Sequence, residues 1–152
     1  MTRRLLTSAM LALFAASLLL AGCGKNKEAA EMENFVMNYC SIMQAAYAKA
    51  DLNIVVPMTT EKELKKLFPV FQALKATGNV MMTEIQDFKV KDVDMDGDKA
   101  SVKTAEKWRF WWQDQGTGRI TKPHVVESYR LRYHLVRFGG SWKVDSVENL
   151  NK

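Results

Sequence analysis

The chain is short and only mildly basic. Its 152 residues carry 22 lysines and arginines against 17 aspartates and glutamates, which gives a formal net charge of +5. A charge this small is not the electrostatic signature of a nucleic-acid-binding domain. The length suits a single domain with its own hydrophobic core, and two cysteines allow at most one intramolecular disulfide.

An export signal is predicted at the N-terminus. Two arginines precede an apolar run over residues 5–21, which is shorter than the roughly 20 apolar residues of a stable membrane span. The run leads into Leu-Ala-Gly-Cys at residues 20–23, which resembles the lipobox of bacterial lipoproteins. The resemblance implies cleavage between Gly22 and Cys23 and attachment of lipid to Cys23, whereas an uncleaved N-terminal anchor is the alternative.

The lipobox resemblance also implies a domain organisation and a location. We expect a signal peptide at 1–22, a lipidated tether at 23–28 and a single α+β domain at 29–152, held at a membrane through the lipid on Cys23. Gly24 follows Cys23 where an inner-membrane retention signal has Asp, which favours the outer membrane, facing the periplasm. Without Arg3 and Arg4 the net charge falls to +3 (20 basic against 17 acidic residues), and a periplasmic address argues further against nucleic acid.

Lipid on Cys23 leaves Cys40 without an intramolecular partner. We predict that Cys40 is a small hydrophobe on a helix. An intermolecular disulfide is the alternative.

Helical periodicity covers the first half of the expected domain. Residues 28–51 predict an amphipathic helix, and a second helix begins near Thr60, where Thr60-x-x-Glu63 fits a capping box. Gly78 is the predicted stop, and Pro69 predicts a break or kink. The buried stripe of the first helix is expected at Met32, Phe35, Val36, Tyr39, Ile42, Met43, Ala46 and Tyr47.

After Gly78 the pattern changes to strands over 80–95, 100–113, 120–138 and 142–147. A switch of parity between Val90 and Val93 predicts a bulge, and Asp96-Gly97 predicts a tight hairpin turn. Helices followed by an antiparallel meander predict an α+β domain, in which a curved four-stranded sheet wraps the helices.

The last hairpin carries a family resemblance. Residues 129–137 (Tyr-Arg-Leu-Arg-Tyr-His-Leu-Val-Arg) and 139–144 (Gly-Gly-Ser-Trp-Lys-Val) resemble the closing hairpin of the nuclear-transport-factor-two-like superfamily. Within it, the pattern is most similar to the intermembrane-space domain of plastid and cyanobacterial division proteins. The resemblance implies a cone-like, cystatin-like fold, in a superfamily that holds isomerases, dehydratases, transport factors and binding modules.

Turn positions fix an expected register, in which Glu106 faces Tyr129, Trp108 faces Glu127, and Leu135 pairs with Val144. Side-chain alternation then predicts the face that packs against the helices. Five of its aromatic members form the candidate pocket: Trp108, Phe110, Trp112, Tyr129 and Tyr133.

Two carboxylates, Glu106 and Glu127, share that apolar face as diagonal neighbours. A like-charged pair against aromatic rings would have one raised pKa, as acid–base sites do, so both are candidate catalytic residues of a small hydrolyase or isomerase. The alternative places them at the solvated mouth of the cone. His124 and His134 are expected on the outer face, with His134 opposite Asp145 as a surface pair.

The outer face of the sheet gathers basic residues around an aromatic side chain. Such a patch suits anionic lipid headgroups or an acidic envelope protein, and an ordinary solvated sheet face is the alternative. The candidate surface-binding residues are Lys103, Lys107, Arg109, Trp111, Arg130 and Arg132.

No metal and no cofactor are expected. Residues 92–98 (Asp-Val-Asp-Met-Asp-Gly-Asp) match the opening of a calcium loop, but Lys103 stands where a bidentate Glu belongs and the flanks predict strands. The leading hypothesis is a non-enzymatic, membrane-anchored binding domain. The alternatives are the small enzyme, or a structural subunit of an envelope complex with an apolar contact at Met81, Met82 and residues 52–58.

Overall fold

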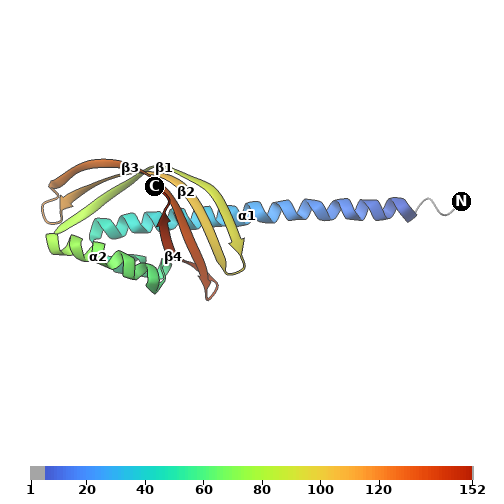
Figure 1. Cartoon of the computed structure of the whole chain (residues 1–152), viewed down its shortest axis with the longest axis horizontal. Coiled ribbons are helices and arrows are strands. Elements are labelled where there is room, and N and C mark those ends of the chain that lie inside the picture. Colours follow the sequence, from blue (N-terminus) through green and yellow to red (C-terminus); the bar gives the residue numbers. More distant parts are fainter. Residues whose placement is uncertain (1–5, 152) are drawn as a thin grey trace. The chain divides into compact units, whose positions relative to one another are not determined.

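In the described part of the chain, three helices precede four strands (Figure 1). The computed structural model describes the backbone of residues 6–151 and the side chains of residues 27–151. The elements are α1 (Leu6–Lys49), the 3₁₀ helix η1 (Leu52–Met58), α2 (Glu61–Thr77), β1 (Asn79–Asp96), β2 (Lys99–Asp114), β3 (Ile120–Phe138) and β4 (Ser141–Asn149). This is the predicted α+β class, and the four predicted strands are present.

The chain divides into two compact units, Met1–Met32 and Glu33–Lys152, and the strands all belong to the second. The predicted signal peptide at 1–22 and the predicted lipidation site Cys23 lie outside the residues whose side chains are described. The helix predicted over 28–51 begins earlier, because α1 is continuous from Leu6 through the predicted tether. In the described part of the chain, no helix is both long and apolar enough to cross a membrane.

The sheet is an antiparallel meander in the order β1-β2-β3-β4. It curves over α2 and the C-terminal part of α1 (Figure 1). The predicted register is confirmed, since Glu106 pairs with Tyr129, Trp108 with Glu127, and Leu135 with Val144. The bulge expected after Val90 is present, and β1 has a second shift between Ile85 and Asp87.

The core lies between the concave face of the sheet and the helices. Val36, Tyr39, Met43 and Ala46, at helical spacing on α1, are at most 8 % exposed. Their counterparts from the sheet alternate along their strands, as a face packed on a core requires, and are Val102, Tyr133, Leu135, Trp142 and Val144.

The start of α2 differs from the predicted capping box. Thr60 is the N-cap residue, but its hydroxyl donates to Asp145 at 3.1 Å and not to the helix. Glu63 is only 4 % exposed and accepts a hydrogen bond from the backbone N–H of Val147 at 3.4 Å. The predicted capping box is therefore wrong, because the side chains of Thr60 and Glu63 both form hydrogen bonds with residues of β4.

The second half of α2 corrects one prediction and confirms another. Of the predicted break or kink at Pro69, the break does not occur, because α2 continues to Thr77 with the side chains of Phe71 and Leu74 buried in the core. Gly78 ends the helix as predicted, with φ of 64°, a left-handed conformation that glycine adopts without a Cβ penalty.

Candidate functional site

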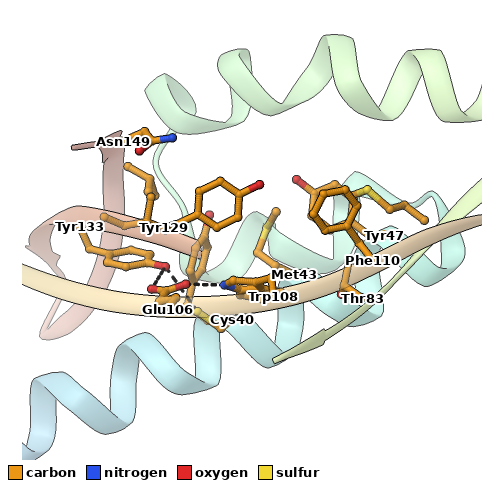
Figure 2. A pocket seen from close by; sticks show the side chains of 14 residues that line it. Cys40, Met43, Tyr47, Thr83, Glu106, Trp108, Phe110, Tyr129, Tyr133 and Asn149 are labelled. Atoms are coloured by element: carbon orange, nitrogen blue, oxygen red, sulfur yellow. Dashed lines mark hydrogen bonds between the residues drawn. The ribbon is translucent and has the colours of Figure 1, made fainter. Parts of the chain in front are cut away.

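A cavity of about 370 Å³ lies between α1 and the concave face of the sheet. Its volume falls in the lower part of the range of ligand pockets, roughly 300–1,000 Å³. α1 and the four strands supply its walls, and Figure 2 shows the side chains converging on it. They are Tyr39, Cys40, Met43, Tyr47, Met81, Thr83, Glu106, Trp108, Phe110, Tyr129, Leu131, Tyr133, Val147 and Asn149.

Glu106 is the charged residue in this wall, and it is 2 % exposed. One carboxylate oxygen accepts hydrogen bonds from the Thr104 hydroxyl at 2.6 Å and the Tyr133 hydroxyl at 2.7 Å. The other accepts from the indole N–H of Trp108 at 2.6 Å (Figure 2). Both oxygens act as acceptors over short distances, which is the geometry of an ionised carboxylate with charge-assisted hydrogen bonds.

Cys40 extends this network into α1. Its sulfur lies 3.5 Å from the Tyr133 hydroxyl oxygen (Figure 2). Because that hydroxyl donates its hydrogen to Glu106, the thiol is the donor to Tyr133. Burial raises the pKa of Cys40 to about 12, and the charge of Glu106 raises it as well. Cys40 is therefore a neutral thiol at pH 7, and the prediction of a buried small residue on a helix is confirmed.

Aromatic rings form half of the remaining wall. Tyr39 and Tyr133 meet edge to face with ring centroids 6.1 Å apart, a favourable arrangement for aromatic pairs. Burial raises the pKa of Tyr47 to about 12. Burial also raises the pKa of Tyr129 to about 12, helped by the hydrogen bond that its hydroxyl donates to Glu127 at 2.5 Å. These phenols are neutral at physiological pH, so the wall carries no other negative charge than Glu106.

The structure places Trp108, Phe110, Tyr129 and Tyr133 of the predicted pocket in the cavity wall. Trp112 lies elsewhere, packed against the cluster of Ala50, Leu74 and Val80. It remains on the concave face, where its ring meets that of Phe110 edge to face with centroids 5.5 Å apart. Alternation therefore predicts its face correctly, but the cavity ends before Trp112.

The two candidate catalytic carboxylates do not form a pair. Glu127 is exposed and bonded to Tyr129, whereas Glu106 is buried and bonded to Trp108. Each carboxylate therefore takes a hydrogen bond from an aromatic residue two positions along its own strand. Glu127 also lies outside the lining of the cavity, as expected for a residue at a solvated mouth.

Several lining residues were not predicted as site residues. The sequence pattern predicts Tyr39, Met43 and Tyr47 in the core stripe of the first helix and Cys40 as a buried helical residue, and the structure places all four in the cavity wall. Their helical spacing is the signal that could have found them, but it does not distinguish a packed core from a cavity wall.

On the outer face of the sheet, acidic side chains neutralise several of the basic residues. Lys103 pairs with Asp92 at 2.9 Å, and Arg132 with Glu148 at 3.1 Å. Arg109 pairs with Glu84 from β1. The Arg130 guanidinium donates to the carbonyl of Leu150 at 3.4 Å, and Lys107 is exposed. Trp111 is stacked on His124 with ring centroids 4.6 Å apart.

His134 has a different partner from the predicted Asp145. Its Nε2 lies 3.6 Å from Glu148. The register of β3 with β4 shifts after His134, so that His134 pairs with Ser146 and Asp145 has no partner in β3. The Lys62 ammonium lies 2.6 Å from the Asp145 carboxylate. Lys62 holds the pKa of the Asp145 carboxyl below its usual value through this hydrogen bond.

Residues 92–98 form the end of β1 and its hairpin turn, and Lys103 neutralises Asp92. In the part of the chain with described side chains, no three His, Cys, Asp or Glu residues are grouped as a metal site. Met81 lines the cavity and Met82 packs against the Ala50 cluster. In η1, Val55 is buried and Val56 is 42 % exposed.

No family model and no curated protein matches this sequence. Among solved structures, the chain is similar to the intermembrane space region of the chloroplast protein ARC6, with a TM-score of 0.70 and 17 % identity over 81 % of this chain and 96 % of that one. It is also similar to a nuclear transport factor 2-like superfamily protein from Salmonella enterica serovar Typhimurium, with a TM-score of 0.55 and 9 % identity over 80 % and 91 %. A periplasmic fragment of TraM has a TM-score of 0.53 and 12 % identity over 78 % and 97 %. At these identities the likeness concerns the fold alone, and the chain has the nuclear-transport-factor-two-like α+β fold.

Proposed function

We propose that this chain is a lipid-anchored protein of the bacterial cell envelope whose domain binds a small, largely apolar ligand in the cavity without converting it. The observation that carries the proposal is the cavity itself, with aromatic and aliphatic walls and a fixed polar group. The superfamily fold alone does not choose between binding and catalysis.

The arrangement of polar groups favours binding over acid–base chemistry. Three donors hold both oxygens of Glu106, so proton transfer to a substrate would require this network to open. Glu127 lies outside the cavity lining, and Cys40 keeps its proton at neutral pH. What the cavity offers is shape, apolar surface and one negative charge.

Filling the cavity tests the binding proposal. Leu131 lines the cavity from β3, and Val126 is an exposed residue of the same strand. With benzyl alcohol as a neutral aromatic probe, quenching of tryptophan fluorescence should report binding to the wild type and to Val126→Trp. Leu131→Trp should lose most of that binding, because the added ring occupies the site. Binding that survives Leu131→Trp, or a wild type that binds nothing, would contradict the proposal.

Support for the lipid anchor is the lipobox-like sequence at residues 20–23 and the apolar run before it. We expect outer-membrane attachment, facing the periplasm, because Gly24 follows the modified cysteine. Labelling cells with radioactive palmitate should mark the wild type and Cys40→Ala, but not Cys23→Ala. Equal labelling of Cys23→Ala, or retention of residues 1–22 in the mature protein, would exclude this anchor.

A further inference from the structure

We infer that the ligand of this cavity is a small organic cation, an alkylated or aromatic ammonium compound. The inference rests on the proposed binding function and names the chemical class of the ligand. Two independent features of the cavity carry it: a buried carboxylate, and a tryptophan ring, neither of which has a cationic partner among residues 27–151.

The carboxylate of Glu106 is held only by neutral donors. None of the ion pairs within residues 27–151 includes it. Buried charges in proteins are generally paired, since neutral hydrogen bonds offset only part of the loss of hydration. The other buried glutamate, Glu63, follows this rule, with the Lys66 ammonium 3.3 Å away. Glu106 departs from it at the position where the fold leaves space for a ligand.

The tryptophans differ in the same way, because three of them lie near a cationic side chain and the one in the cavity wall does not, among the described residues. Arg109 lies 5.9 Å from the ring centre of Trp111, and Lys122 lies 5.0 Å from that of Trp112. Arg137 lies 4.5 Å from the ring of Trp142. Trp108 is the remaining tryptophan of the sequence, and within the described residues no such cation lies over it.

A cation in the cavity would satisfy both features together. Aromatic faces attract ammonium groups, most strongly when water is excluded, and cages of aromatic residues bind quaternary ammonium groups in this way. Phe110, Tyr129 and Tyr47 surround the same space as Trp108 (Figure 2). The charge of Glu106 attracts a cation and repels an anion through the low dielectric of the wall. The apolar surface accommodates the rest of the ligand.

Three probes of similar size separate charge from shape: benzyltrimethylammonium, neutral benzyl alcohol and anionic phenylacetate. Each is titrated into the full chain in dodecyl maltoside, with tryptophan fluorescence as the readout. We expect the cation to bind about tenfold or more tightly than the alcohol, and phenylacetate to bind most weakly. Glu106→Gln should weaken the cation about tenfold and change the alcohol little. Glu148→Gln, which removes an exposed carboxylate outside the cavity, is the matched control.

The outcomes distinguish the two proposals. If none of the probes binds, the binding function fails and the inference fails with it. If the alcohol binds as tightly as the cation, the binding function stands and the cation inference is overturned.

A second variant covers the case in which Glu106→Gln does not fold. Phe110→Leu keeps an apolar side chain but removes a π face, and it should weaken the cation about three- to tenfold relative to the alcohol. Equal loss of both probes would also contradict a cation site.

Discussion

Two glutamates are buried in the described part of the chain, and the fold surrounds them differently. Glu63 lies in the first turn of α2, with the Lys66 ammonium at 3.3 Å and the Val147 N–H at 3.4 Å. Glu106 lies in the wall of the cavity, with three neutral donors at 2.6 to 2.7 Å. The Glu63 carboxylate therefore has a cationic partner at a longer distance, whereas the Glu106 carboxylate has short hydrogen bonds and no cationic partner among the described residues.

The difference separates Glu63, whose carboxylate forms an ion pair within the protein, from Glu106, whose carboxylate is available to a ligand in the cavity. Burial raises the pKa of Glu63, although Lys66 and the Val147 N–H act in the opposite direction. The carboxylate of Glu63 interacts with a cation of the same chain, Lys66. The donors to Glu106 come from β2 and β3, strands whose mutual register fixes their positions, and the residue lines the cavity. The contrast predicts that changes at the two sites have different consequences.

Removal of the Glu106 side chain should have the largest effect. Glu106→Ala leaves the donors of Thr104, Trp108 and Tyr133 without their acceptor, and we expect a loss of about 3 kcal/mol in the free energy of unfolding. Urea denaturation followed by circular dichroism measures it. Glu63→Ala should lose clearly less, because it removes longer contacts with one half-exposed lysine. Equal losses at the two sites would remove the distinction between them.

The phenol that links Cys40 to Glu106 gives the next largest effect. Tyr133→Phe removes one charge-assisted hydrogen bond in a buried site and should lower the free energy of unfolding by about 1.5–3 kcal/mol. Tyr129→Phe is the matched control, because its acceptor Glu127 is exposed and can be hydrated. We expect the control to lose less than about 1 kcal/mol. A control as damaging as Tyr133→Phe would show that burial does not set these energies.

Much of this contrast could be predicted from the sequence, and the reasons are physical. Turn positions and the period of two in a strand place Glu106 opposite Tyr129 on the apolar face, and the structure has that pairing. The predicted bounds of β3 are also those observed. Alternation along a strand is a local property, so a single sequence contains it.

Other features depend on tertiary contacts that a local pattern does not contain. Thr60 and Glu63 match a capping box, yet both side chains interact with β4. Trp112 lies on its predicted face, but it packs against Ala50, Leu74 and Val80 and not into the cavity. The existence of a cavity depends on how sheet curvature and side-chain volumes leave space above α1. For that reason, the helical spacing of Tyr39 and Met43 predicts that they face the core but does not predict a cavity there.

The pH dependence of stability tests the Glu63 side of the comparison. Its folded-state pKa is raised, mainly by burial, above the unfolded value of about 4.3. The folded state therefore binds this proton more tightly, so the stabilisation is present below pH 4.3 and is lost as the pH rises through the raised pKa. Relative to Glu63→Gln, the wild type should lose free energy of unfolding as the pH rises from about 4 to neutrality. If the wild type instead gained free energy of unfolding relative to Glu63→Gln over this range, Lys66 and not burial would dominate the pKa of Glu63.

An exposed carboxylate completes the comparison and should give the smallest effect. Glu148 pairs with Arg132 at 3.1 Å on the outer face, where solvent reaches both side chains. Arg132→Ser should lower the free energy of unfolding by less than about 1 kcal/mol, because hydration and screening replace most of the pair. Since neighbouring carboxylates already neutralise Arg132, Lys103 and Arg109, the same variant should also leave binding to anionic vesicles unchanged. A marked loss of vesicle binding would instead make the outer face, and not the cavity, the place to look for the partner of this domain.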